Sequence, residues 1–220
     1  MDEERLRAWL ARAAGDDGLR ITALKRLSGG AIQQNWALDV ETREGTKRWV
    51  LRTDAPAVLA VSLPRAAEYA LLCAARDAGV TVAAPLFLCE DTGVIGRPFF
   101  VMGRVDGIAA AHRVVKQAAP YGDEVVAALG RELACIHRIV PPRADLGFLG
   151  DPPADPARAM IASMRARLDE ARTPRPVLEW GLRALERHVP APVAPVLCHH
   201  DFRTGNIMLD GARVSAVLDW

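Results

Sequence analysis

The sequence predicts an α+β protein in which an antiparallel sheet comes first and a mostly helical part follows. Three observations lead to this fold class. Short apolar runs and turn residues alternate from residue 21 to residue 52 in the order of an antiparallel meander, without a βαβ unit, and further short runs follow up to residue 102. Helical spacing of apolar residues dominates from residue 122 to residue 188. Two short runs joined by Asp210-Gly211 predict a hairpin at the C-terminal end.

Strand candidates form the first part, and polar or glycine-containing turns separate most of them. Glu90–Gly93 is predicted as a turn between the last two candidates. In chain order, the strand candidates are Ile21–Leu27, Trp36–Val40, Arg48–Arg52, Val80–Cys89 and Arg97–Met102.

Helix candidates flank these strands and make up most of the second part. Their ranges are Asp2–Ala14, Pro64–Ala78, Gly122–Val140 and Pro176–His188, and one more begins at Asp155-Pro156. Gly122–Val140 is the clearest, because its apolar residues recur at helical spacing and predict one packed face. These residues are Val125, Val126, Leu129, Leu133, Ile136 and Val140.

The composition excludes several classes of function. The 220 residues are 50% hydrophobic, which is enough for one sizeable core or two small lobes. The 28 basic and 27 acidic residues almost cancel, so neither nucleic acid nor a membrane surface is expected as a partner. Neither a membrane span nor a signal-peptide core is present in the sequence. Four scattered cysteines are expected to be buried thiols of a reducing, cytoplasmic compartment; they are Cys73, Cys89, Cys135 and Cys198.

The last twenty-two residues hold the strongest chemical signal. His199, Asp201 and Asn206 follow the spacing H-x-D-x-x-x-x-N, and Asp219 follows thirteen positions later. This is the spacing of a kinase catalytic loop and its metal-binding aspartate. Phosphoryl transfer needs these groups, because one carboxylate orients the acceptor hydroxyl and the other oxygens hold Mg²⁺ on the nucleotide phosphates.

Each polar residue of this segment receives a predicted role. Asp201 is the candidate base, and Asn206 and Asp219 are the candidate Mg²⁺ ligands. We expect His199 to brace the loop by hydrogen bonds, and Arg203 to neutralise phosphate charge or to anchor Asp201. Flanking apolar runs predict strands on both sides of the loop, at Val196–Cys198, Ile207–Leu209 and Val214–Leu218.

Three features of the first part suggest a nucleotide site. Ser28, Gly29 and Gly30 form either an ordinary hairpin turn or a flap whose backbone N–H groups cover phosphates. Arg52 stands where a kinase strand carries its lysine, and Glu68 stands near the start of the next helix. In kinases this cation pairs with the helix glutamate and contacts the phosphates. Taken singly, Arg52 and Glu68 are each better explained as a solvated charge, and it is their order along the chain that favours a nucleotide site.

The terminal segment, HxDFRTGN followed by VLDW, resembles the aminoglycoside phosphotransferase and choline kinase-like family. The resemblance implies a protein-kinase-like fold of two lobes, an N-terminal nucleotide-binding lobe at 1–103 and a catalytic lobe at 104–220. It also implies ATP and Mg²⁺ as cofactors and a small-molecule hydroxyl acceptor. Family members normally continue with further helices, so we expect a C-terminally truncated member with an incomplete helical lobe.

The same resemblance assigns roles to other residues. It places Phe100, Val101 and Met102 at the hinge between the lobes, along the wall of the adenine pocket. His137 ends the family's L-x-x-L-H segment, and we expect it to have a packing or hydrogen-bonding role. His200 stands where the family often has glycine.

Two alternatives to a phosphotransferase remain open from the sequence. One is a nucleotide-binding protein of the same fold without catalysis. The other is a metal-dependent hydrolase that uses His199, His200 and Asp201 as ligands. The acceptor is also open, because the region from Arg138 to His188 is slightly rich in arginine, whereas aminoglycoside kinases need acidic pockets. Choline, a sugar or a macrolide would serve equally.

Overall fold

The computed structural model describes residues 2–27, 33–55, 63–171 and 173–220. Contacts divide the chain into two compact units. The first unit contains the residues up to Ile139 together with Cys198–Trp220, and the second contains Val140–Leu197. All candidate site residues that the structure describes lie in the first unit. The predicted lobe boundary after Gly103 stays a prediction.

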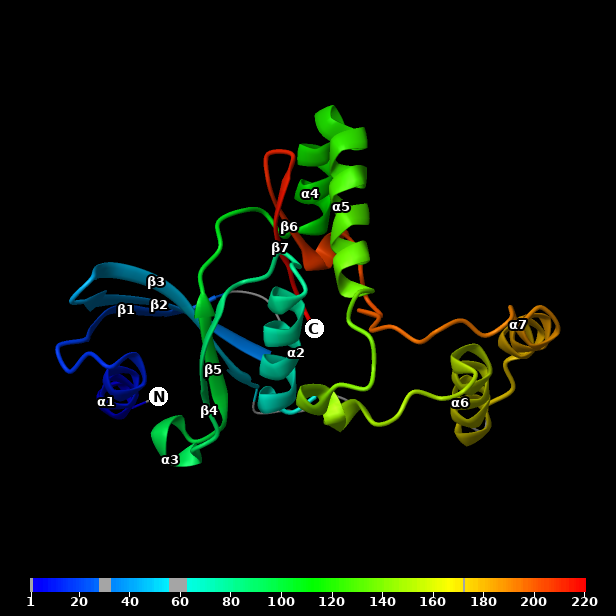
Figure 1. Cartoon of the computed structure of the whole chain (residues 1–220), viewed down its shortest axis with the longest axis horizontal. Coiled ribbons are helices and arrows are strands. Elements are labelled where there is room, and N and C mark those ends of the chain that lie inside the picture. The colour runs from blue at the N-terminus through cyan, green and yellow to red at the C-terminus, as the bar shows by residue number, and fades with distance from the viewer. Residues whose placement is uncertain (1, 28–32, 56–62, 172) are drawn as a thin grey trace. The chain divides into compact units, whose positions relative to one another are not determined.

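A five-stranded antiparallel sheet forms the centre of the first unit, with the order β1-β2-β3-β5-β4 (Figure 1). The predicted α+β class is therefore confirmed. The predicted meander holds for the first three strands, whereas β5 lies between β3 and β4 in the sheet. The strands are β1 (Arg20–Arg26), β2 (Gln33–Thr42), β3 (Gly45–Asp54), β4 (Pro85–Cys89) and β5 (Phe99–Gly103).

One face of this sheet carries the largest apolar core. The helix α1 (Glu3–Ala14) covers it, and Leu10 of this helix is fully buried. Leu51 of β3 and Phe99 of β5 are also fully buried in the same cluster. Trp9 packs edge-on against Phe99, with ring centroids 4.9 Å apart. This packing holds β3 and β5 together beneath α1.

The opposite face of the sheet carries a polar group instead. The helix α2 (Arg65–Asp77) covers this face, and Figure 1 shows α1 and α2 on opposite sides of the strands. Side chains alternate along a strand, so Arg52 and its cross-strand partner Phe100 point away from the α1 core. Tyr69 of α2 packs against Phe100, with ring centroids 5.8 Å apart. Arg52 is only 7% exposed, and a buried guanidinium requires charged partners.

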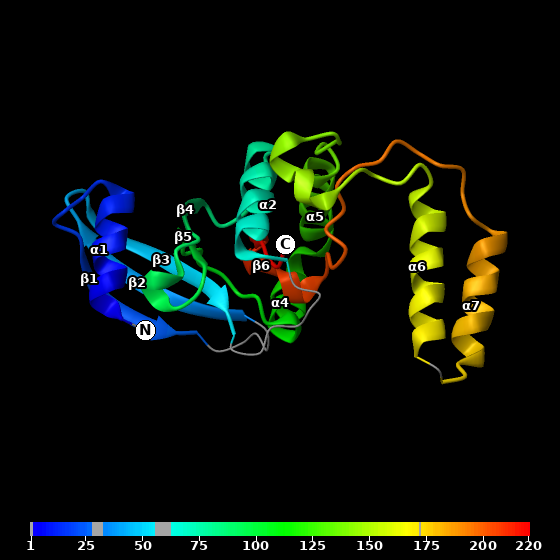
Figure 2. The ribbon, with the colours of Figure 1, turned by 90° about the horizontal axis from the view of Figure 1, so that it is seen from below.

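After β5 the chain builds a helical layer beside the C-terminal hairpin (Figure 2). A backbone bridge between Ile108 and Leu209 connects the segment after β5 to the hairpin. The elements of this layer are α4 (Ala111–Ala118), η1 (Ala119–Tyr121), α5 (Gly122–Ile136), η3 (Thr204–Asn206), β6 (Ile207–Asp210) and β7 (Arg213–Val217).

Thr81, which precedes β4, connects two of these elements. Its backbone N–H and its Oγ1 donate to the Glu132 carboxylate of α5, at 2.8 and 2.7 Å. Its carbonyl oxygen accepts from the N–H of Val217 at 2.7 Å. Val217 lies two residues before Asp219, so these bonds fix the strand that leads to the predicted metal ligand.

The second unit is small and contains η2 (Ala144–Leu149), α6 (Pro156–Glu170) and α7 (Pro176–Arg187). Arg165 of α6 pairs with Glu179 and Glu186 of α7, each at 2.9 Å. Trp180 of α7 is 74% exposed, so this unit presents apolar surface to solvent. No helix among the described residues is long and apolar enough to cross a membrane.

Several local predictions differ from the structure. Val196–Cys198 forms no strand, because none of the described strands lies beside it to share a hydrogen-bonded ladder. The predicted turn at Glu90–Gly93 instead opens a short helix, α3 (Thr92–Ile95), whose first turn Asp91 caps by accepting from the Gly93 N–H at 2.8 Å. The sequence did not predict α4.

Other differences concern burial. The predicted face of Gly122–Val140 is only partly packed, since Val126 is 68% and Val140 51% exposed and the helix ends at Ile136. Of the four thiols predicted to be buried, Cys89 is buried but Cys198 is exposed, and the other two are intermediate. Apolar sequence neighbours do not bury Cys198, because the segment around it belongs to no packed strand.

A substitution at Gly107 can test the contact between the segment after β5 and the C-terminal hairpin. Its φ of +145° is open only to glycine, and an added methyl would lie 2.6 Å from Ser215 Oγ and 2.9 Å from the Leu209 carbonyl oxygen. We predict that Gly107→Ala lowers the free energy of unfolding by about 1–3 kcal/mol in urea titrations.

Gly130→Ala in α5 is the matched control. An added methyl there meets no atom within 4 Å, and alanine favours a helix by roughly 0.5–1 kcal/mol over glycine. The control should therefore be neutral or stabilising. Equal stability of Gly107→Ala and the wild type would contradict the close packing at Gly107.

Candidate active site

His199 braces the loop that carries the candidate base. Its Nε2 lies 2.9 Å from the Leu218 carbonyl oxygen, which can only accept, so Nε2 carries the proton. This leaves Nδ1 as an acceptor, and the N–H of Asp201 points to it at 3.4 Å. The Trp220 ring packs edge-on against His199, with centroids 4.9 Å apart. His199 thus ties the loop to the residues on both sides of Asp219.

Asp201 is oriented by two neighbours and remains accessible. Arg203 Nε donates to both carboxylate oxygens, at 2.9 and 3.0 Å. Asn206 Nδ2 donates to Oδ2 at 2.8 Å and to the Asp201 carbonyl oxygen at 3.0 Å. The Asp201 side chain is nevertheless 55% exposed, so a hydroxyl group from solution can reach it.

The hairpin returns Asp219 to the loop. The N–H of Leu218 donates to the carbonyl oxygen of Asn206 at 2.8 Å, which aligns the end of the hairpin with its beginning. Both His200 and Asp219 have left-handed backbones, with φ of 63° and 66°. This conformation suits glycine best, which gives a physical reason for glycine at the His200 position in the family.

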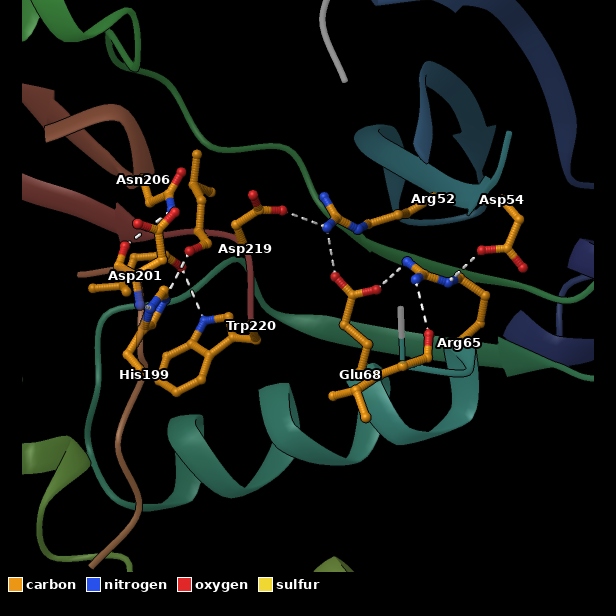
Figure 3. Close-up of polar contacts among 12 residues, drawn as sticks. Arg52, Asp54, Arg65, Glu68, His199, Asp201, Asn206, Asp219 and Trp220 are labelled. Carbon is orange, nitrogen blue, oxygen red and sulfur yellow. Dashed lines mark hydrogen bonds and ion pairs between the residues drawn. The ribbon is translucent and has the colours of Figure 1, made fainter. Parts of the chain in front are cut away.

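Asp219 also reaches the sheet, as Figure 3 shows. Arg52 Nη2 lies 2.8 Å from Asp219 Oδ1 and 2.7 Å from Glu68 Oε1. Arg52 and Glu68, predicted as a pair, therefore do form an ion pair. One guanidinium of β3 joins an acid of α2 to an acid that follows β7.

Two further residues of this network were not predicted from the sequence. Arg65 at the start of α2 pairs with Glu68, and its Nε lies 3.0 Å from Asp54 Oδ1 of β3. A cation in the first turn of a helix opposes the helix dipole. Arg65 is in this unfavourable position, three residues before Glu68. This pattern could have indicated that an acid compensates the charge of Arg65.

Burial dominates the electrostatics of Glu68. The side chain is 3% exposed, and this desolvation raises the pKa of its carboxyl above the ordinary value of 4.5. The positive charges of Arg52 and Arg65 oppose the rise in pKa. Both arginines therefore help to keep Glu68 available as an anion.

Asn206 and Asp219 have the chemistry of Mg²⁺ ligands. The amide nitrogen of Asn206 is used on Asp201, so this side chain would coordinate a cation through Oδ1. Asp219 is half exposed and offers Oδ2 besides the oxygen bound to Arg52. Mg²⁺ commonly takes one or two carboxylates and completes its shell with phosphates and water. The donor set therefore fits Mg²⁺ on a nucleotide.

The geometry does not favour the hydrolase alternative, which needs His199 as a ligand, because its Nε2 is bonded to the Leu218 carbonyl. Within the described ranges, no group of three or more His, Cys, Asp or Glu side chains is placed to hold a metal ion.

The remaining predicted residues are less informative. Ser28, Gly29 and Gly30 lie outside the described residues. Among the hinge residues, which are Phe100, Val101 and Met102, Val101 belongs to the core under α1, so its side chain cannot line a nucleotide pocket. Their role at the adenine stays a prediction. His137 is exposed after α5.

A sheet with a buried cation–acid pair, followed by helices and this catalytic loop, defines a kinase-like protein. Residues 23–220 match the phosphotransferase enzyme family, and the chain belongs to this family. The expected family resemblance is therefore confirmed.

Solved structures share the fold. A Ralstonia eutropha protein, provisionally called an aminoglycoside phosphotransferase, is 24% identical with a TM-score of 0.74; the match covers 100% of this chain and 64% of that one. A thermostable mutant of aminoglycoside phosphotransferase APH(4)-Ia, in complex with AMP-PNP and hygromycin B, is 18% identical with a TM-score of 0.64 over 98% of this chain and 70% of that one. Macrolide 2′-phosphotransferase MphH from Brachybacterium faecium is 20% identical with a TM-score of 0.59 over 96% and 69%.

Curated relatives are much longer. Acyl-CoA dehydrogenase family member 10 of Mus musculus is 30% identical over 157 residues, which is 70% of this chain and 15% of that protein. Acyl-CoA dehydrogenase family member 11 of Gallus gallus is 30% identical over 157 residues, 20% of its length. The chain thus spans a small part of the curated relatives that it matches.

The raised pKa of Glu68 predicts that the stability of the fold depends on pH. Its pKa is raised in the folded state, so the folded chain holds a proton that the unfolded chain has lost once the pH exceeds about 4.5. The stability from this group is therefore greatest below that pH and declines as the pH rises towards the folded pKa. We predict that the unfolding free energy of the wild type falls relative to that of Glu68→Gln across this window, in urea titrations.

Asp106→Asn is a control of opposite sign. Arg48 lowers the pKa of Asp106, so its contribution to stability is lost as the pH falls below the ordinary value of 3.8. A pH-independent difference between the wild type and Glu68→Gln would contradict the raised pKa.

Proposed function

We propose that this chain is an ATP-dependent phosphotransferase that transfers the γ-phosphate to a hydroxyl group of a small molecule. Family membership supports the reaction class. The single observation that carries the proposal is the position of Asp219, which lies between the catalytic loop and Arg52 in Figure 3. In a kinase-type site, a carboxylate between the catalytic loop and the strand cation holds the metal ion that bridges the β- and γ-phosphate oxygens.

At the acceptor end, Asp201 orients the hydroxyl and takes its proton as the new O–P bond forms and the bond from the γ-phosphorus to the leaving oxygen breaks. Arg203 Nε and Asn206 Nδ2 fix the direction of the Asp201 carboxylate before the acceptor arrives. Pre-positioning of this kind supplies much of the rate in phosphoryl transfer.

At the nucleotide end, Arg52 contacts phosphate oxygens while Glu68 holds its guanidinium. Asn206 and Asp219 would hold Mg²⁺, which when bound neutralises charge on the phosphates. ATP is the proposed donor, and structures of similar fold contain AMP-PNP in one case and GDP in another. The first assay should therefore compare ATP directly with GTP as the phosphate donor.

The acceptor is proposed only as a small molecule with a hydroxyl group. The structures of similar fold include enzymes named for aminoglycosides and macrolides. The arginine content of residues 138–188 argues against a polycation in particular. The cytoplasmic location also stays a prediction.

One observation favours a second candidate, a nucleotide-binding protein without catalysis. The ion pair between Arg52 and Asp219 occupies one oxygen of a predicted Mg²⁺ ligand. If phosphate and Mg²⁺ cannot displace this contact into a productive arrangement, nucleotide would bind without transfer. Assays of binding and of transfer on the same preparation separate the two candidates.

We predict that Asp201→Asn lowers phosphate transfer from radiolabelled MgATP by about 10²–10⁴-fold, because the acceptor loses its base. Transfer is measured over a panel of alcohols that includes choline, sugars, macrolides and aminoglycosides. Affinity for MgATP, measured by calorimetry, should change less than about threefold, since Asp201 faces the acceptor.

Asp210→Asn is the matched control, because it makes the same chemical change in the exposed turn of the hairpin. It should retain transfer. Full transfer by Asp201→Asn would contradict the role of Asp201, whereas tight MgATP binding without transfer or hydrolysis by the wild type would favour the second candidate.

A further inference from the structure

Arg65 is a buried charge that the proposed reaction does not use. It is the first residue of α2 and is 2% exposed. Its guanidinium makes three contacts: an ion pair with Glu68, an ion pair with Asp54 at 3.0 Å, and a hydrogen bond from Nη2 to the Leu63 carbonyl oxygen at 3.1 Å. A guanidinium that is buried with this set of partners is fixed in place.

The contacts divide the carboxylate of Glu68 between two arginines. Oε2 bonds to Arg65 Nη1, and Oε1 lies 2.7 Å from Arg52 Nη2. A carboxylate held at both oxygens cannot rotate about its terminal bond. Arg65 therefore sets the direction in which Oε1 meets Arg52, as Figure 3 shows.

Arg65 also adds to the charge balance of Glu68. Burial of Glu68 disfavours its anionic form, and the positive charge of Arg65 opposes that effect together with Arg52. Asp54, at the end of β3 and two residues after Arg52, is the counter-ion of Arg65. The network therefore ties β3 to α2 at two points.

Arg52 has two competing partners, because the same Nη2 atom lies near both Glu68 and Asp219. With Glu68 held by Arg65, Arg52 keeps a partner on α2 while it also contacts Asp219. A loosely held or neutral Glu68 would leave Asp219 as the stronger partner, and Arg52 would then close on the predicted metal ligand.

We propose that Arg65 is a positioning residue, which holds Glu68 so that Arg52 keeps its partner on α2 and can turn from Asp219 to the nucleotide phosphates when MgATP binds, instead of pairing with Asp219 alone. The inference rests on the proposed function, since it assumes that MgATP binds beside Arg52. What it adds to the proposed function is that a second arginine, which does not itself contact the phosphates, influences nucleotide affinity through Glu68.

The first experiment measures the dissociation constant for MgATP by calorimetry, at a temperature at which each variant is folded. Arg65→Met should weaken binding about tenfold or more, because misdirection of a phosphate ligand has effects of this order. Arg65→Lys should restore part of the affinity, since it returns the charge without the forked geometry.

Leu6→Ala is the control for stability alone. Leu6 is fully buried in the core on the other face of the sheet, so this change destabilises the chain without touching the network. Its affinity for MgATP should stay within about twofold of the wild type. An equal loss of affinity in Leu6→Ala and Arg65→Met would overturn the positioning role.

The second experiment is a double-mutant cycle. Because Arg65 acts through Glu68, Arg65→Met should weaken MgATP binding less than about twofold when Glu68→Gln is already present. A full, additive loss in that background would contradict the inference. If Arg65→Met does not fold, Asp54→Asn loosens Arg65 from its other side and should weaken binding by a smaller factor.

The outcomes separate the two proposals. Failure of the wild type to bind MgATP would overturn the proposed function and this inference together. Binding by the wild type, with Arg65→Met and Asp54→Asn both unchanged, would overturn the inference alone. Weaker binding in Arg65→Met, partial recovery in Arg65→Lys and non-additivity with Glu68→Gln would support it.

Discussion

Arg52 Nη2 lies within hydrogen-bond distance of two carboxylates that come from distant parts of the chain, Glu68 and Asp219. Glu68 belongs to the helix that covers the sheet, and Asp219 follows the hairpin 167 positions after Arg52. Because Arg52 is buried, loss of either partner would leave charge in a poorly solvated place. This constraint brings the end of the chain against the sheet, and the candidate site is built around it.

The candidate catalytic loop is held mainly by backbone and ring contacts rather than by a regular ladder. His199 bonds to the Leu218 carbonyl, and Leu218 bonds back to Asn206. These two contacts close the loop around Asp201 from both sides. Thr81 adds a third restraint, because it bonds both to Val217 of β7 and to Glu132 of α5. Asp219 therefore follows a strand that is fixed to α5 through the segment before β4.

Local patterns predicted much of this arrangement. The alternation of apolar runs identified the meander, and the spacing of His199, Asp201, Asn206 and Asp219 identified the loop. Contacts that depend on tertiary packing could not be predicted from the sequence. Neither Asp54 nor Arg65 belongs to a motif, and their pairing arises only when β3 and α2 meet. The failed strand at Val196–Cys198 has a related cause, since a short apolar run becomes a strand only beside a partner.

A structure with Mn²⁺ and AMP-PNP bound would test the central claim most directly. Mn²⁺ takes the same oxygen ligands as Mg²⁺ and is visible by anomalous scattering. We predict an anomalous peak about 2.1 Å from Asn206 Oδ1 and from a carboxylate oxygen of Asp219. Phosphate oxygens should contact Arg52, and Glu68 should remain paired with Arg52. A nucleotide and cation bound elsewhere, with Arg52 still closed on Asp219, would contradict the central claim.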